Sequence, residues 1–143
     1  MAEFYLQSEA KKTKASLENL FEFLSDFKNF ESILPSDKVE GFTYTEIECS
    51  FVIKGITPMK VNIDEKVPHK YIKFKSEGLG KFNFRLKTVF IGESSQSGEC
   101  LIEMHGDLNP IILNMAKASL EQLINTMAHK LGELNEHELK PNN

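Results

Sequence analysis

The chain has 143 residues, a length that fits one domain, and 41% of them are hydrophobic, which is enough for a real core. Its net charge is −4 and its basic residues form no stripe, which argues against a protein that binds nucleic acid. No apolar stretch is long enough to span a membrane, and no secretion signal opens the chain. We therefore expect a cytoplasmic protein. Cys49 and Cys100 have no metal or redox spacing, so the sequence predicts no metal and no cofactor.

The N-terminal part of the chain predicts one strand followed by two short helices. Residues 3–12 alternate between two faces, which is typical of a strand. Ser16 is the expected N-cap of a helix of about ten residues, with Leu20 and Leu24 on its buried stripe. A second short helix is expected over 29–34 and ends at Pro35, because the residue before a proline avoids helical angles.

From residue 39 onward the apolar period changes from helical to alternating, which predicts a series of strands. The connections between these strands are short and contain Gly or Pro, so neighbouring strands should form antiparallel hairpins. The strands are expected over 39–47, 50–55, 59–67, 71–77, 82–91 and 99–108.

A long apolar helix is expected over 110–134, with Asn109 as its N-cap and Pro110 in its first turn. Strands with one apolar face need a cover, and this helix is the expected one. We predict an α+β fold in which a curved antiparallel sheet of about seven strands wraps around the C-terminal helix, with the first strand beside the last. Residues 1–134 should form a single domain and 135–143 a frayed tail. The apolar stripe of the helix contains Ile112, Met115, Ala116, Leu120, Leu123, Met127, Leu131 and Leu134.

This order of elements resembles the START-like (SRPBCC) helix-grip superfamily, which includes the birch pollen allergen, polyketide cyclases and a family of carbon monoxide dehydrogenase proteins. The resemblance is carried by residues 16–35, 67–74 and 107–134, and it covers nearly the whole chain. The chain is most similar to the small bacterial members of unassigned function. The resemblance implies a cavity between sheet and helix whose lining varies with the ligand, and it implies no catalytic residue here.

The apolar residues on the inner faces predict a binding site for a small hydrophobic molecule, such as a lipid, a quinone or a polyketide-like ring system. Eleven phenylalanines and five methionines, with no tryptophan, make a soft interior. The alternative is that the same side chains fill the space as a dry core. The expected lining of the pocket is Phe42, Phe51, Ile53, Phe74, Phe84, Met104, Met115, Ser119, Leu123 and Met127.

Strand parity with Ile63 and Val67 would direct Glu65 toward this pocket. Burial would raise the pKa of this carboxyl, which would then act as an acid, a base or a ligand anchor. The interpretation that the sequence favours instead places Glu65 on the rim, where the strand twists toward the next turn. An alternative function is a cyclase- or hydrolase-type enzyme that uses Glu65 with Ser119 or Tyr44. A further alternative is a protein-interaction module that uses the outer face of the sheet.

The last strand places Glu103, His105 and Asp107 on one face, a set that can bind a divalent metal. The other face of this strand is apolar and should meet the core, so the three side chains should face water. Hairpin pairing then sets Arg85 and Lys87 beside them as cross-strand charge pairs. The sequence favours this surface interpretation over a metal site.

Overall fold

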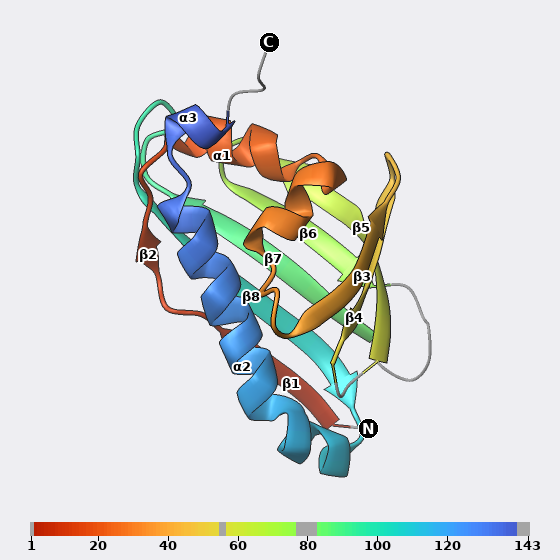
Figure 1. Ribbon diagram of the computed structural model, residues 1–143. Coiled ribbons are helices and arrows are strands. Elements are labelled where there is room, and N and C mark those ends of the chain that lie inside the picture. Colours follow the sequence, from red (N-terminus) through yellow and green to blue (C-terminus); the bar gives the residue numbers. More distant parts are fainter. Residues whose placement is uncertain (1, 55–56, 77–82, 140–143) are drawn as a thin grey trace.

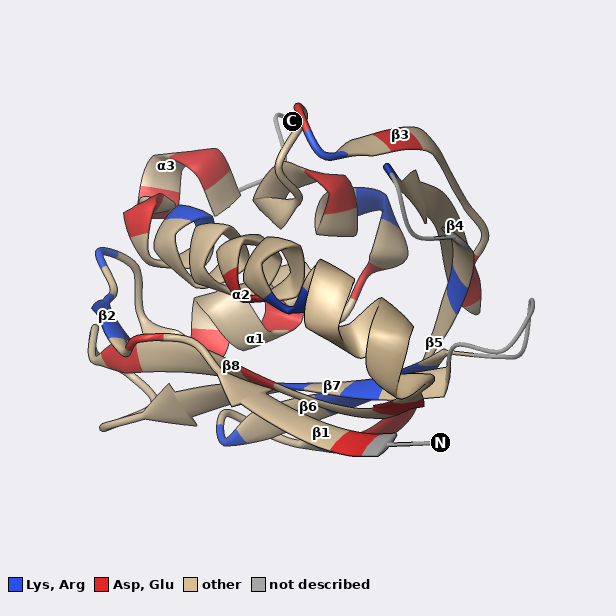
Figure 2. Ribbon diagram, turned by 90° about the horizontal axis from the view of Figure 1, so that it is seen from below, with Lys and Arg blue, Asp and Glu red and all other residues tan. Residues whose placement is uncertain are grey.

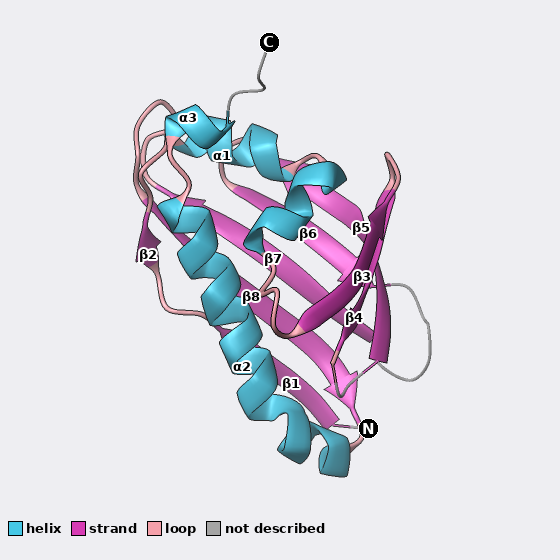
Figure 3. Cartoon of the chain, in the orientation of Figure 1, coloured by secondary structure: helices cyan, strands magenta, loops and turns pink. Residues whose placement is uncertain are grey.

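A computed structural model describes residues 2–54, 57–76 and 83–139 as a curved sheet that holds one long helix on its inner face (Figures 1 and 3). No helix in these ranges is both long enough and apolar enough to cross a membrane. The elements in chain order are β1 (Ala2–Gln7), β2 (Lys11–Lys12), α1 (Leu17–Leu24), η1 (Phe27–Ile33), β3 (Val39–Tyr44), β4 (Glu48–Ile53), β5 (Thr57–Val67), β6 (Tyr71–Ser76), β7 (Asn83–Ile91), β8 (Glu99–Leu108), α2 (Pro110–Glu133) and α3 (Glu136–Leu139).

The eight strands form one antiparallel sheet in the order β1-β8-β7-β6-β5-β4-β3, with β2 also paired to β8. The α+β helix-grip fold and the pairing of the first strand with the last are therefore confirmed. The first strand is divided in two at Ser8. The Oγ of Ser8 accepts a hydrogen bond from the N–H of Ile102 at 2.8 Å, so a hydroxyl replaces a backbone carbonyl in the ladder at this point.

The two short helices begin at side-chain caps. Ser16 Oγ accepts a hydrogen bond from Asn19 N at 3.3 Å and starts α1, as predicted. The second segment is a 3-10 helix that starts at Phe27, where the side chain of Asp26 accepts from Lys28 N. It ends before Pro35, as predicted.

The strand ends differ from the prediction where side chains form local turns. β3 ends at Tyr44 because the Oγ1 of Thr45 accepts hydrogen bonds from Ile47 N and Glu48 N, which closes a turn over residues expected in strands. The strand boundaries expected at 55, 77 and 82 lie outside the described residues.

The core is a single cluster between the sheet, the two short helices and α2, and phenylalanine rings occupy its centre. Phe30 has no exposed surface, and its ring centroid lies 5.2 Å from that of Phe74 and 6.3 Å from that of Phe51. Phe27 completes this group, 6.2 Å from both Phe30 and Phe74. Phe30 and Phe74 meet edge-on, which is a favourable arrangement for aromatic rings.

The residues after Leu134 include a short helix, α3, which differs from the frayed tail expected there. Glu136 lies at the start of α3, and its Oε1 accepts a hydrogen bond from Ser16 N at 2.7 Å. Its Oε2 accepts from Asn19 Nδ2 at 2.5 Å. The carboxylate thus supports the N-terminus of α1, where negative charge is favourable. This contact spans the whole chain, so local composition gave no sign of it.

Candidate functional site

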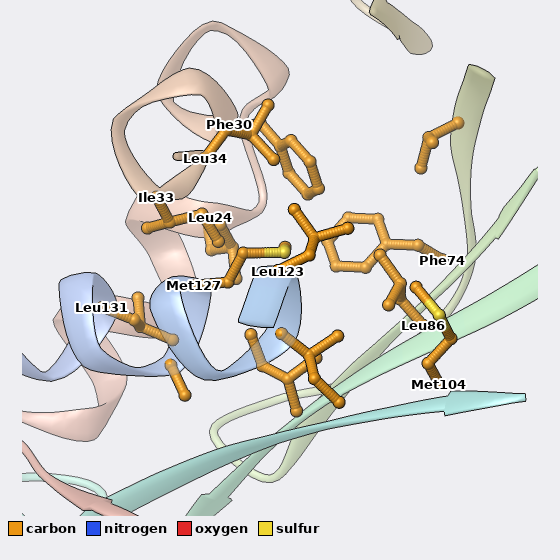
Figure 4. Close-up of a cluster of buried hydrophobic side chains, with 14 of the residues drawn as sticks. Leu24, Phe30, Ile33, Leu34, Phe74, Leu86, Met104, Leu123, Met127 and Leu131 are labelled. Atoms are coloured by element: carbon orange, nitrogen blue, oxygen red, sulfur yellow. The ribbon is translucent and has the colours of Figure 1, made fainter. Parts of the chain in front are cut away.

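Most of the predicted pocket residues meet in one place, between the inner face of the sheet and α2. Figure 4 shows Leu123 and Met127 of α2 directed toward Phe74 of β6 and toward Met104 of β8. Phe42 is partly buried and packs against the same cluster. The members of the predicted lining that are buried in this cluster are Phe51, Ile53, Phe74, Phe84, Met104, Leu123 and Met127.

Two predicted pocket residues on α2, Met115 and Ser119, do not face the interior. Met115 is 78% exposed, and Ser119 is also exposed. The buried face of α2 is centred on Leu120, Ile124 and Met127, and Met115 and Ser119 lie beside it on the helix surface. The stripe predicted from the sequence was therefore too wide on this side.

Glu65 does not point toward the interior, so the prediction from strand parity is wrong. The register between β5 and β6 shifts between Ile63 and Glu65, which inserts an extra residue into β5. A bulge of this kind reverses the parity of every residue after it. Glu65 therefore shares the outer face with Tyr71, whose hydroxyl donates to it at 3.1 Å, and with Lys73, which pairs with it at 3.3 Å.

The residues of the enzyme alternative are not brought together. Glu65 lies on the outer face of the sheet, Tyr44 is 55% exposed on β3, and Ser119 is exposed on α2. A catalytic pair needs its groups within hydrogen-bond reach of a common substrate. The arrangement of these three side chains does not meet that requirement.

The interior is closed around the predicted ligand site. Met104, Leu120 and Ile124 have no accessible surface. A void large enough for a water molecule would expose part of its lining, so no such void borders these residues. In this state the inner face is a dry core, and a ligand would have to displace side chains to enter.

The two cysteines lie in this apolar interior and are not activated as nucleophiles. Burial raises the pKa of the Cys49 thiol to about 12 and that of the Cys100 thiol to about 12, with a smaller contribution from the neighbouring carboxylates of Glu48 and Glu99. The Sγ of Cys100 lies 3.6 Å from the carbonyl oxygen of Ala128, to which it donates.

We expect neither cysteine to react with iodoacetamide at mildly alkaline pH while the protein is folded, and both to react in denaturant. Because the pKa of each thiol is raised in the folded state, its contribution to stability is full below the ordinary pKa of 9.0 and declines as pH rises toward about 12. Mass spectrometry of the alkylated protein checks the labelling. Rapid labelling of the folded protein would contradict the burial of these thiols.

The outer face carries the predicted row of charged residues. Arg85 lies opposite His105, and Lys87 lies opposite Glu103, so the predicted placement of the two basic residues beside this set is confirmed. Close ion pairs between these strands are absent from the described residues; His105 instead meets the ring of Tyr5 edge-on at 4.8 Å. The described part of the chain also holds no cluster of three metal-ligating side chains.

Replacing His105 with Ala should change the free energy of unfolding by less than about 1 kcal/mol, because exposed pairs contribute little. Chemical denaturation of the two proteins measures the difference. Stoichiometric zinc or iron in the purified protein, lost on this substitution, would show that the surface interpretation is wrong.

A groove of about 660 Å³ lies on this outer face, on the opposite side of the sheet from α2. It crosses four adjacent strands, β1, β8, β7 and β6. Strand parity correctly placed Arg85, His105 and Asp107 on this face, but Tyr5 and Lys75 were missed. Extending the predicted strand pairing to β1 and to β6 would have placed Tyr5 beside His105 and Lys75 beside Arg85.

Known proteins resemble this chain in structure but not in sequence. No family model and no curated protein matches it. Norcoclaurine synthase from Thalictrum flavum is 9% identical, with a TM-score of 0.68 over 92% of this chain and 85% of that one. A conserved protein from Geobacillus kaustophilus is 12% identical, with a TM-score of 0.66 over 90% of this chain and 93% of that one. A START superfamily protein from Mycobacterium smegmatis is 12% identical, with a TM-score of 0.62 over 87% of this chain and 94% of that one. The chain therefore has the START-like fold that the sequence resemblance implied.

Proposed function

We propose that this protein binds a small apolar molecule between the sheet and α2, and that the N-terminal half of α2 moves to admit it. The observation that carries the proposal is the unequal attachment of α2 to the rest of the protein. The C-terminal half of α2 is fastened by hydrogen bonds to other elements. The N-terminal half is held by side-chain packing and presents large apolar residues to solvent.

Long-range hydrogen bonds attach the C-terminal half of α2 to the segments on either side of β2 and to the end of η1. In the N-terminal half the described bonds are local, as between Asn109 Oδ1 and Ile111 N at 2.8 Å. The long-range bonds run from Glu9 N to Asn125 Oδ1 at 2.9 Å, from Lys130 Nζ to Leu34 O at 2.8 Å, and from Lys14 N to Gly132 O at 3.0 Å.

The N-terminal half of α2 carries an exposed apolar cluster. Ile111 is 72% exposed, Ile112 47% and Met115 78%, within two turns of the helix. Single apolar side chains on a surface need no explanation, but a cluster of them marks a site for a ligand or a partner. The cluster continues into the core through Ala116, so an apolar molecule that settles on it is already beside the interior.

The interior that would receive the molecule can repack. Met59, Met104 and Met127 are buried there, and their unbranched side chains adapt to irregular shapes better than branched ones do. Displacing such side chains costs free energy, which the burial of the ligand must exceed. Binding would therefore favour an open state of α2 that is rare in the absence of ligand.

A fluorescence titration with N-phenyl-1-naphthylamine, a neutral apolar probe, tests the proposal. We expect saturable binding, and we expect 1-decanol or a naphthoquinone to compete for it. The double variant Ile112→Gln, Met115→Gln should bind the probe more weakly and unfold at the same denaturant concentration, since both side chains are exposed.

The matched control is Ala118→Gln, which adds the same amide to an exposed position of the same helix. It should bind the probe like the unchanged protein. No saturable binding, or equal weakening by the control and the double variant, would contradict the proposal.

A further inference from the structure

The outer-face groove has two rows of polar side chains, one containing basic residues and the other containing acidic residues. In one row Lys75 lies opposite Arg85, Arg85 opposite His105, and His105 opposite Tyr5. Neighbouring strands lie about 4.8 Å apart, so these side chains stand next to one another. In the next row, toward the start of β7, Asp107 lies between Asn83 and Glu3. Figure 2 shows basic positions on β7 and the acidic start of β1 on the same sheet, with β8 between these two strands.

The size of the groove suits a small molecule. Its volume of about 660 Å³ is far larger than an inorganic ion needs and lies within the range typical of ligand sites. Tyr5 and His105 form one wall, with their rings edge-on at 76°. The floor is the backbone of four adjacent strands, which are anchored below by buried side chains such as Leu86 and Met104. The floor of the groove is therefore anchored by the core beneath it.

Arg85 stands apart from the other cations of this face because its side chain has no ion pair or hydrogen bond among the described residues. Lys73 is paired with Glu65 at 3.3 Å, and Lys87 lies over the ring of Tyr71 at 4.4 Å. A guanidinium has five donors in a planar fork that matches the oxygens of a carboxylate or a phosphate. The groove that Arg85 lines is large enough to hold such a group.

Lys75 adds a second cation at the same end of the groove. Its one ion pair, with Asp64, has a length of 3.9 Å and is the longest of those described. A pair of this length at a half-exposed site contributes little, so the ammonium can turn toward a ligand at small cost.

We propose that this groove binds a small molecule with an oxyanion, either a carboxylate or a phosphate group, between Lys75 and Arg85, and with hydroxyl or amino groups near Asp107 and Glu3. Carboxylate side chains accept hydrogen bonds from such donors, and they repel a second anion. The two rows thus select molecules that are anionic at one end only. The site lies on the opposite face of the sheet from α2 and is independent of apolar binding there.

Titration calorimetry and amide NMR shifts with three probes test this site. The probes are glucosamine 6-phosphate, glucuronate and inorganic phosphate. We expect saturable binding of glucosamine 6-phosphate or of glucuronate, which decides between the two oxyanions, and shifts centred on β6, β7 and β8. Arg85→Gln should weaken that binding by about ten-fold or more, since a hydrogen bond to a charged group is lost.

The control for nonspecific attraction is Lys117→Gln, which removes a cation from the exposed face of α2. It should leave the affinity unchanged. Asp107→Asn should weaken binding of glucosamine 6-phosphate more than binding of inorganic phosphate, because only the sugar reaches the acidic row. Absence of saturable binding for both sugars, equal loss in Arg85→Gln and Lys117→Gln, or no effect of Asp107→Asn on the sugar would overturn the proposal. Apolar probe binding should be the same in Arg85→Gln as in the unchanged protein, which separates the two sites.

Discussion

Phe30→Ala should lower the free energy of unfolding by about 3–5 kcal/mol, the largest loss we expect for a single substitution. Phe30 has no exposed surface, and its ring lies among those of Phe27, Phe51 and Phe74. Removing it leaves a cavity that rigid neighbouring rings cannot fill. It also removes the ring contacts of Phe30 in η1 with Phe51 of β4 and Phe74 of β6. Urea denaturation followed by circular dichroism measures the loss.

Tyr44→Ala is the matched control, because it removes an aromatic ring that is 55% exposed. Its ring lies 6.2 Å from that of the partly buried Phe42, so we expect a loss of less than about 1 kcal/mol. Similar losses for Phe30→Ala and Tyr44→Ala would contradict the position of η1 against the sheet.

Leu123→Ala should lower the free energy of unfolding by about 2–5 kcal/mol, the range for a leucine in a filled core. Leu123 is 2% exposed and lies beside Phe30 and Phe74 (Figure 4). At the edge of an open ligand cavity it would have fewer neighbours, and only the transfer free energy, about 1–2 kcal/mol, would be lost. The packed interior favours the larger value. Denaturation midpoints with unchanged slopes measure the difference.

Met115→Ala on the same helix should change the free energy of unfolding by less than about 0.5 kcal/mol, since Met115 is exposed. The pair therefore tests which face of α2 is buried. The apolar probe should restore part of the stability of Leu123→Ala, because a ligand that binds only the folded state stabilises it. Loss below about 1 kcal/mol for Leu123→Ala would show that the interior is open without ligand.

The order of the elements and their pairing were predictable because each depends on local patterns. Alternating residues with short Gly- and Pro-containing turns predict antiparallel neighbours. The parity of β7 and β8 placed Arg85 near His105, and in the structure the two lie opposite each other. The helix N-caps Ser16 and Asn109 were predictable from the sequence for the same reason, since the side chain of an N-cap accepts a hydrogen bond from a residue two or three positions away.

The predictions that the structure contradicts concern features that depend on distant parts of the chain. The bulge before Glu65 reversed the parity of β5, and nothing in the local sequence marks it with a glycine. The width of the buried stripe on α2 depends on what lies beneath each turn, so Met115 and Ser119 were misplaced. Glu136 supports the start of α1 through Ser16, which lies 120 positions earlier in the sequence. Such contacts are set by the tertiary structure.

The most direct test of apolar binding between sheet and helix is methyl NMR of the protein with N-phenyl-1-naphthylamine. Methyl groups of Met104, Leu123 and Met127 report on the interior, and that of Met115 reports on the surface of α2. We predict nuclear Overhauser effects from the naphthyl protons to Met104, Leu123 and Met127. Effects confined to Met115 and its exposed neighbours, or no effects at saturating probe, would contradict binding in the interior.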